Sequence, residues 1–237
     1  MKTLAIIPAR AGSQRVPAKN TRLLGGQPLI RWSINVAKQI PTLTNILVTT
    51  DDLSALQIAK DSGVLAPWLR PSHLSTASSS TSDVLIHALE WYENEYGAVD
   101  AILLLQPTSP FRTKASIEQA LMLFDNESSH AVISVSTVNQ HPSWAFQIKD
   151  GLLTPYQNLT DINLRSQELS ELYIPNGSIY LVDRNQFLIE KNLYLKQTNP
   201  LIIESPVESI DIDSEWDFTM AEILSSHFAE LRFLNCQ

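Results

Sequence analysis

The 237-residue chain is 44% hydrophobic and 18% charged, and it carries a formal net charge of −8. A chain of this length and composition is expected to fold as one globular domain, residues 1–237, without disulfide support. The negative charge argues against non-specific nucleic-acid binding and against an anionic membrane surface, and no apolar run approaches the ~20 residues of a transmembrane helix. The single cysteine, Cys236, excludes a disulfide framework and favours a reducing, cytoplasmic location.

Short apolar runs alternate with segments of helical periodicity along the chain. Residues 4–7 are an apolar run that ends at Pro8, which predicts a buried strand, and residues 29–38 have apolar side chains at helical spacing. The same two patterns predict strands at 46–49, 102–105, 131–135, 178–182 and 201–203, and helices at 53–62, 82–96, 114–124 and 217–228. This order predicts an α/β, Rossmann-like fold, in which a mostly parallel sheet carries helices on both faces.

Polar segments follow several of the predicted strands. They lie at residues 8–20, 49–52, 106–112 and 209–213. Because parallel sheets bind ligands beyond the carboxyl ends of their strands, we expect these segments to converge on one site.

Residues 139–175 interrupt the alternation of strands and helices. They contain turn-forming pairs at 141–142 and 150–151 and little helical periodicity. We interpret them as a small β-rich excursion from the domain, which serves either as an arm for dimer contact or as a lid over the substrate.

The loop after the first strand concentrates positive charge. Arg10, Arg15 and Lys19 fall within ten residues, and Gly12 and Ser13 lie between them. Glycine lets backbone N–H groups approach a ligand, and Arg and Lys donate to phosphate oxygens. The loop has neither the Walker A nor the dinucleotide-binding pattern. The residue types fit an anion site and a solvated surface loop equally well, and the position after the first strand favours the anion site.

Two acids lie near the end of the chain, in the alternating segment 209–213. If this segment is extended, Asp211 and Asp213 share one face. Adjacent carboxylates repel unless a cation lies between them, and Mg²⁺ prefers one or two carboxylates together with substrate phosphates. The alternative is that Asp213 begins the following helix as an N-cap or a first-turn acid.

Three further polar segments have both a structural and a functional interpretation. Gln106 opens a turn stiffened by two prolines and either reads a base or sugar edge or serves the turn alone. The hydroxyl-rich run at 78–82 either caps a helix or contacts a base. Asn176 lies in a turn signal at 175–178, for which the structural interpretation is favoured.

Together these motifs resemble those of the acylneuraminate (CMP-sialic acid family) cytidylyltransferases. The resemblance extends over residues 2–222, and five motifs in the same order make it specific although each alone is weak. The matching segments are 8–20, 69–71, 104–110, 175–177 and 209–213. The phrases at 10–13, 67–71, 141–144 and 176–180 are most similar to legionaminic-acid-type members of the family.

The resemblance implies a nucleotidyltransferase fold, a homodimer built through residues 139–175, CTP as a substrate and Mg²⁺ or Mn²⁺ as cofactor. By position, the residues implied in nucleotide binding are Arg10, Gly12, Ser13, Arg15, Lys19, Asn20, Arg70 and Ser80. Gln106 and Arg165 are implied in sugar binding, and Asp211 and Asp213 in metal binding. The residues implied in catalysis are Arg10, Lys19 and Asp213.

The chain departs from the family pattern at a few positions. Gln14 replaces the usual lysine, so Arg15 is expected to supply that charge. Ile174 replaces a basic residue on the sugar side, and the lysine found near Trp144 in sialic-acid enzymes is absent, which argues against N-acetylneuraminate itself.

The expected activity is transfer of CMP from CTP to a nine-carbon keto-sugar acid, N,N'-diacetyllegionaminic or a sialic acid, with release of pyrophosphate. The alternatives are a CMP-pseudaminate or CMP-Kdo synthetase and, from another class of protein, a non-catalytic nucleotide-binding regulator.

Overall fold

A computed structural model describes residues 1–125, 129–158 and 161–226. Its centre is a six-stranded sheet in the order β10 (Thr198–Ile202), β6 (Ala131–Thr137), β9 (Tyr173–Asp183), β5 (Ala101–Leu104), β1 (Thr3–Ala9) and β4 (Leu43–Thr50). Neighbouring strands are parallel except at β9, which runs antiparallel to both β5 and β6. The prediction of a mostly parallel sheet is confirmed.

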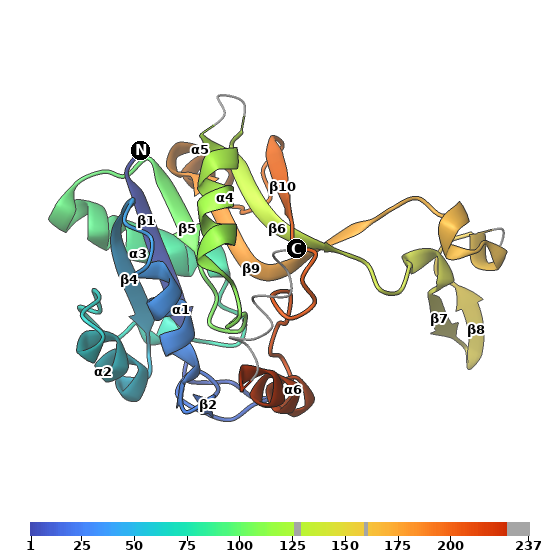
Figure 1. Ribbon diagram of the computed structural model, residues 1–237, viewed down its shortest axis with the longest axis horizontal. Helices are drawn as coiled ribbons and strands as arrows, with labels where there is room; N and C mark the ends of the chain where they lie inside the picture. The colour runs from blue at the N-terminus through green and yellow to red at the C-terminus, as the bar shows by residue number, and fades with distance from the viewer. Residues whose placement is uncertain (126–128, 159–160, 227–237) are drawn as a thin grey trace.

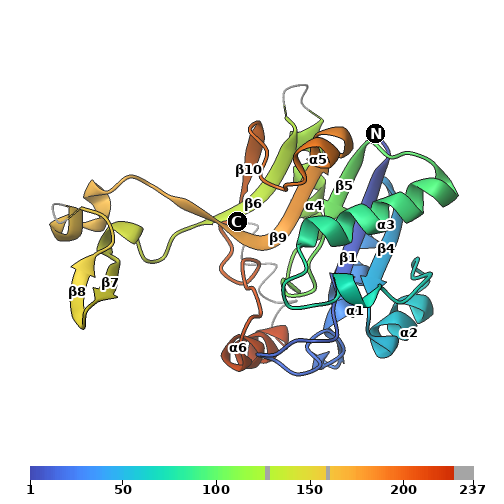
Figure 2. The same ribbon diagram turned by 180° about the vertical axis from the view of Figure 1, so that it is seen from behind.

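Helices cover both faces of the sheet (Figures 1 and 2). The alternating residues of β1 show the two layers: Ala5 and Ile7 pack in one apolar cluster, and Leu4 and Ile6 pack in another. The first cluster includes buried residues of α1 (Leu29–Ala37), α2 (Leu53–Asp61) and α4 (Lys114–Phe124). The second includes buried residues of α3 (Thr81–Tyr96) and α5 (Arg184–Glu190). Both faces of β1 are therefore buried, which is why its sequence is a continuous apolar run.

A third apolar cluster joins α6 (Glu215–Ser225) to the short hairpin of β2 (Leu23–Leu24) and β3 (Gln27–Pro28). Phe218 of the helix packs there with Leu24 and with Val16 of the cationic loop. The helix was predicted at 217–228, and positions 227 and 228, like Cys236, lie outside the described residues. None of the helices in the described part of the chain is long and apolar enough to cross a membrane.

Short polar side chains fix where the helices begin. Asp52, Ser80, Thr113 and Ser214 are the N-caps of α2, α3, α4 and α6, and each side chain accepts hydrogen bonds from backbone N–H groups of the first turn. The capping interpretation of the 78–82 run is thus confirmed for Ser80. The alternative in which Asp213 caps the last helix is wrong, because Ser214 does so.

Two local predictions are corrected. Residues 175–178 form no turn but lie inside β9, where the pairing with β6 shifts register and Gly177 has a φ of 78°. This irregularity is a β-bulge, and the residue types that predict a turn from sequence are also suited to a bulge. Residues 209–213 are not a strand, because Ile212 turns into the third cluster and its N–H binds the carbonyl of Thr108 at 2.8 Å.

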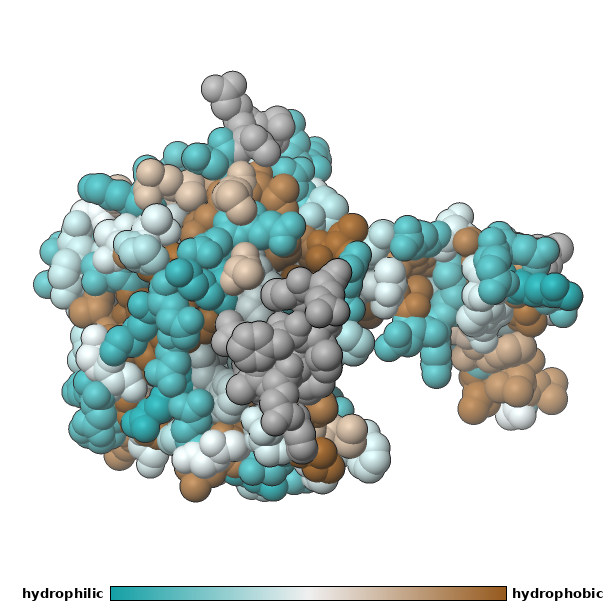
Figure 3. Space-filling view, in the orientation of Figure 1, coloured by the Kyte–Doolittle hydropathy of each residue, from teal (hydrophilic) through white to brown (hydrophobic). Residues whose placement is uncertain are grey.

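The excursion predicted at 139–175 leaves the body between β6 and β9 and projects away from the sheet (Figures 1 and 2). It contains a hairpin of β7 (Phe146–Lys149) and β8 (Leu152–Pro155), and the 3₁₀ helices η2 (Pro142–Trp144), η3 (Asp161–Asn163) and η4 (Ser166–Glu168). A further 3₁₀ helix, η1 (Ser72–Leu74), lies in the body. The hairpin exposes apolar side chains, brown in Figure 3: Phe146, Ile148, Leu152 and Leu153.

Helix α5 provides a test of the packing on the second face. Phe187 is fully buried there, whereas Ile189 on the same helix is exposed. We expect Phe187→Ala to lower the free energy of unfolding by about 3–5 kcal/mol, because it leaves a cavity in the core. The matched variant Ile189→Ala should change it by less than about 0.5 kcal/mol. Urea unfolding measures both, and equal losses would contradict the assignment of this face.

Candidate active site

A cleft of about 290 Å³ opens at the carboxyl ends of β1 and β5. The predicted site residues that line it are Arg10, Ser13, Arg15, Lys19, Asn20, Arg70, Gln106 and Asp213. They come from four separate segments of the chain. Three of the four predicted polar strand ends, 8–20, 106–112 and 209–213, meet in the cleft. The fourth, 49–52, does not line it but is bonded to it through Asp51. Gln14 also lines the cleft, beside Arg15.

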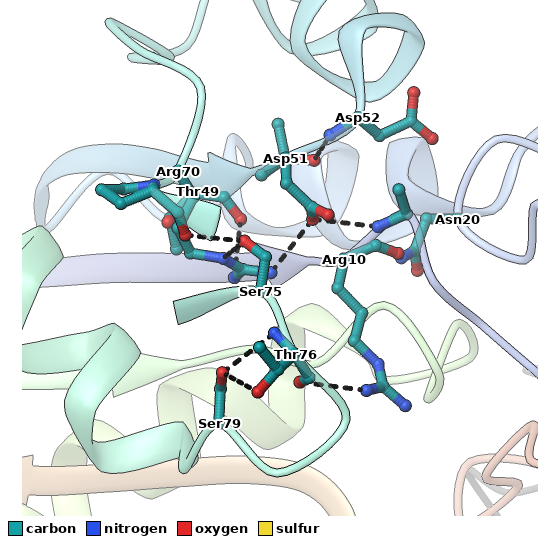
Figure 4. A network of polar contacts seen from close by, with 12 residues as sticks. Arg10, Asn20, Thr49, Asp51, Asp52, Arg70, Ser75, Thr76 and Ser79 are labelled. Atoms are coloured by element: carbon teal, nitrogen blue, oxygen red, sulfur yellow. Dashed lines mark hydrogen bonds and ion pairs between the residues drawn. The ribbon is translucent and has the colours of Figure 1, made fainter. Parts of the chain in front are cut away.

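Asp51 organises the side of this cleft that is formed by the cationic loop and Arg70. Its Oδ1 atom accepts a hydrogen bond from the backbone N–H of Ala11 at 3.0 Å and an ion-pair contact from the Arg70 guanidinium at 3.2 Å (Figure 4). The amide of Asn20 donates to the carbonyl of Arg10 at 3.0 Å. These contacts hold the cationic loop in one shape, and its charged tip at Arg10 stays exposed.

Arg70 is buried behind the loop and has acceptors on each side of its guanidinium. Besides Asp51 these are the hydroxyl of Ser75 at 3.1 Å and the carbonyl of Thr49 at 3.5 Å. Burial lowers the pKa of Arg70, and the Asp51 carboxylate opposes that shift. The side chain remains a fixed positive charge in the wall of the cleft.

On the opposite side, two cations of the loop meet the acidic segment. Arg15 lies 3.0 Å from one carboxylate oxygen of Asp213, and Lys19 Nζ lies 3.6 Å from the other. Lys19 also donates to the carbonyl of Ile212 at 2.6 Å. Burial lowers the pKa of Lys19, whereas the charge of Asp213 raises it. The residue expected to hold metal is thus already in contact with the residues expected to hold phosphate.

Asp211 lies close to Asp213 and in a less favourable environment. Desolvation by the surrounding protein raises the pKa of Asp211, the hydrogen bond with Thr108 opposes this, and the neighbouring charge of Asp213 adds to it. A cation bound between the carboxylates of Asp211 and Asp213 would relieve this repulsion. Among the described residues no group of three or more His, Cys, Asp or Glu side chains gathers as a metal site, so any metal here would take its remaining ligands from substrate or water.

Gly177 brings the bulge of β9 against this acidic corner. A Cβ atom on Gly177 would lie 3.2 Å from Oε1 of Gln106, 3.3 Å from Oγ of Ser109 and 3.6 Å from Cγ of Asp211. A side chain there would crowd Gln106 and Ser109, so the site needs glycine both for its positive φ and for close approach. Asn176 beside it is buried and bonded to Ser134 and Ser136, as the structural interpretation predicts.

Four of the predicted site residues are not among those that line the cleft: Gly12, Ser80, Arg165 and Asp211. Asp211 is bonded to Thr108, which does line the cleft. Arg165 lies in the projecting arm, where its side chain is exposed. Ser80 caps α3, and its neighbours Ser79 and Thr81 line the cleft instead. Gly12 is exposed at the loop tip, with open space around it.

Sequence reasoning did not single out Asp51 or the buried Arg112. For Asp51 a signal exists, because an acid directly after a parallel strand lies at the ligand-binding edge. Its two partners are 40 and 19 residues distant in the chain, and nothing local identifies them.

The α/β sheet, the cation-lined cleft at its carboxyl edge and the facing acidic pair define a protein of the nucleotidyltransferase type. The model of the cytidylyltransferase family matches residues 4–222, and the chain belongs to this family. It is therefore a nucleotidyltransferase, and the resemblance identified from the motifs is confirmed.

Two relatives show how similar the sequence is to particular members of the family. It is 39% identical over 225 residues to a CMP-N,N'-diacetyllegionaminic acid synthase of Legionella pneumophila, an alignment that covers 94% of this chain and 96% of that protein. It is 31% identical over 220 residues to an N-acylneuraminate cytidylyltransferase of Streptococcus agalactiae, covering 92% of this chain and 52% of that longer protein.

A solved structure with a similar fold is the CMP:2-keto-3-deoxy-manno-octonic acid synthetase complexed with CTP. The TM-score is 0.68 at 18% identity, and the alignment covers 98% of this chain and 100% of that one. At this identity the likeness shows the fold, and it confirms the predicted nucleotidyltransferase architecture.

The raised pKa of Asp211 gives a prediction about stability. A carboxyl whose pKa in the folded protein exceeds its usual value of 3.8 destabilises the fold once it ionises. We expect Asp211→Asn to raise the melting temperature at neutral pH. The gain should shrink as the pH falls through the folded-state pKa and vanish below 3.8, where the carboxyl is protonated in both states.

Asp217 is the matched control with the opposite sign. Burial alone would raise the pKa of Asp217, but hydrogen bonds from the Ser214 hydroxyl and from the N–H groups of Asp213 and Ser214 outweigh it and lower the pKa. Asp217→Asn should therefore reduce the melting temperature at neutral pH, and the loss should fade as the pH drops through the folded-state pKa. Thermal unfolding across pH measures both variants, and the same sign for both would refute the electrostatic account.

Proposed function

We propose that this cytidylyltransferase uses CTP to activate a nonulosonic acid, forming the CMP-sugar and pyrophosphate. The observation that carries the proposal is the meeting of three groups in one cleft: the cationic loop, Asp213 of the acidic pair and Gln106. The relatives support the acceptor class, because their names specify legionaminic, N-acylneuraminic and pseudaminic acids. We place the reaction in the cytoplasm, where CTP is available.

The triphosphate would lie along the loop after β1. We assign to it Arg10, Gly12, Ser13, Arg15, Lys19 and Asn20, and we place the nucleoside toward Arg70 and Ser80. Arg15 and Lys19 now contact Asp213, and a triphosphate offers them stronger acceptors than one carboxylate does. Arg15 supplies the charge that Gln14 lacks, because both side chains line the cleft side by side.

Asp211 and Asp213 fit a divalent cation of the Mg²⁺ or Mn²⁺ type. Desolvation raises the pKa of Asp211 and the charge of Asp213 adds to the shift, and a cation bound between the two carboxylates would offset both effects. Once bound, the cation would neutralise charge on the triphosphate and polarise its α-phosphate.

The chemical step joins the anomeric 2-hydroxyl oxygen of the sugar acid to the α-phosphorus of CTP, and the bond to pyrophosphate breaks. Arg10 and Lys19 stabilise the charge that develops on pyrophosphate, since both are positive groups fixed before the reaction begins. Gln106 orients the sugar from the far side of the cleft, and Asp213 is our candidate acceptor for the hydroxyl proton. The protein contributes positioning and charge neutralisation rather than covalent chemistry.

We further propose that the chain acts as a homodimer through the arm at 139–175. The hairpin tip exposes Ile148, Leu152 and Leu153 together, a surface that favours burial against another protein surface (Figure 3). Arg165 lies in the same arm and does not line the cleft of its own chain, and the arm projects away from the body (Figure 1). A partner subunit would then supply Arg165 to the sugar carboxylate.

The identity of the sugar is proposed as N,N'-diacetyllegionaminic acid, with a sialic acid next. The order of identities supports this choice, with 39% to the legionaminic, 31% to the N-acylneuraminic and 27% to a pseudaminic relative from Campylobacter jejuni. CMP-pseudaminate or CMP-Kdo synthesis is the alternative within enzymes.

Pyrophosphate release tests the activity. With CTP and Mg²⁺, we expect release with N,N'-diacetyllegionaminic acid and slower release with N-acetylneuraminic, pseudaminic and Kdo substrates. Asp213→Asn should reduce kcat by at least about 100-fold, because it removes a charge needed at the triphosphate. The control Glu215→Gln changes a neighbouring acid that binds Arg22 outside the cleft and should keep its activity.

Two negative results of this assay would contradict different parts of the proposal. CTP binding without pyrophosphate release from any acid would favour the non-catalytic regulator. Near wild-type turnover by Asp213→Asn would overturn the role of that carboxylate.

Mixing of two inactive variants tests the arm. We expect Arg165→Ala and Asp213→Asn each to be inactive, and a refolded equimolar mixture to recover roughly a quarter of wild-type activity, since half the dimers then contain one complete site. Lys149→Ala, which removes an exposed cation on β7 of the same arm, should remain active alone. A mixture that stays inactive would show that Arg165 does not act across the dimer.

A further inference from the structure

Arg112 is a buried positive charge beneath the sugar side of the cleft, and the proposed reaction assigns it no role. It is 2% exposed and is not among the residues that line the cleft. Burial lowers the pKa of Arg112 to about 9, and the carboxylates of Glu208 and Asp211 oppose the shift. Within the described residues it forms no ion pair shorter than 4.0 Å. A buried charge of this kind is costly unless other polar groups surround it.

The groups that surround Arg112 are oxygen atoms from three elements. Its Nε atom donates to the carbonyl of Ser178 at 2.8 Å, and its two terminal nitrogens donate to the hydroxyl of Ser33 at 2.7 Å and the carbonyl of Gln106 at 2.6 Å. Ser33 also donates to the carbonyl of Gln106 at 3.3 Å. One guanidinium thus ties α1, the end of β5 and the bulge of β9 to one another.

Both backbone segments that Arg112 holds lead directly to cleft residues. Gln106 itself lines the cleft, and Thr108 two residues on is bonded to Asp211 and to the N–H of Ile212. On the other strand, Gly177 precedes Ser178 and abuts the side chains of Gln106 and Asp211. Arg112 therefore fixes the surroundings of the Gln106 side chain through two backbone segments, that of Gln106 itself and that of Gly177 and Ser178.

We propose that Arg112 is a positioning residue for the acceptor sugar: by clamping the carbonyls of Gln106 and Ser178, it holds Gln106 at the cleft and Asp211 next to it. This rests on the proposed function. The nucleotide half of the cleft depends on a separate network, in which Asp51 binds Ala11 and Arg70. Loss of the clamp should therefore impair use of the sugar acid and spare the binding of CTP.

The decisive variant is Arg112→Lys, which keeps the charge and loses the three-directional fork. We expect kcat/KM for N,N'-diacetyllegionaminic acid to fall by about 10-fold to 100-fold, because small displacements of orienting groups cost that much. The dissociation constant of CTP, measured by calorimetry without sugar acid, should stay within about twofold of wild type. Arg184→Lys is the matched control, since Arg184 forms a fork with Glu93 between α3 and α5 and does not line the cleft.

Ser33→Ala provides a second variant in case Arg112→Lys does not fold. It removes one acceptor of Arg112 with little change in volume and should show the same selective loss, about threefold to tenfold. Its control, Ser62→Ala, removes a hydroxyl hydrogen bond at the end of α2 and should leave both constants unchanged.

The outcomes separate this proposal from the one on which it rests. Wild-type turnover of the sugar acid with unchanged kcat/KM in Ser33→Ala and Arg112→Lys would overturn the positioning role alone. So would an equal loss of CTP binding and of sugar use. Absence of pyrophosphate release by the wild-type protein with every acid would overturn both.

Discussion

A buried guanidinium must have hydrogen-bond acceptors on every side, and at the carboxyl edge of this sheet the acceptors come from the elements that surround the cleft. Arg70 draws together the end of β4, Asp51 and Ser75, and Arg112 draws together α1, β5 and β9. Neither side chain can move without leaving a desolvated charge or an unpaired carbonyl, so each holds one wall of the cleft in place. The strands end in loops that do not pair with one another, and Arg70 and Arg112 hold the segments at these strand ends in fixed positions.

The charges inside the cleft are arranged for a ligand rather than for stability. In a chain of net charge −8, three cations are gathered in one loop opposite two acids, and burial disfavours the charged form of both Lys19 and Asp211. The contacts of Arg15 and Lys19 with Asp213 compensate this only in part, because Arg15 and Asp213 are both well exposed and exposed pairs contribute little. A triphosphate with its divalent cation would complement both signs together, which is the electrostatic reason to place the proposed reaction here.

Sequence patterns predict the parts of this molecule that depend on local chemistry. The apolar runs at β1 and β5 and the helical spacing in α1 and α3 mark elements that are buried in the way their patterns require. The antiparallel direction of β9 was not predicted, because the chain reaches this strand through the arm rather than through a crossover helix. The short α5 was missed too, since only Phe187 marks its buried side.

At the site, too, sequence patterns predict the residue types but not the contacts between distant segments. The sequence identifies the cations and the acids, but the pairing of Asp51 with Ala11 and the contact of Gly177 with Gln106 depend on how distant strands approach. Asp211 and Asp213 come together without the strand that their alternation suggests, because Ile212 anchors the loop between them. In the proposed reaction, β1 and β4 lie on the nucleotide side of the cleft, and β5 and β9, together with the arm, lie on the acceptor side. The bulge at Gly177 is where the strand that leaves the arm meets Gln106.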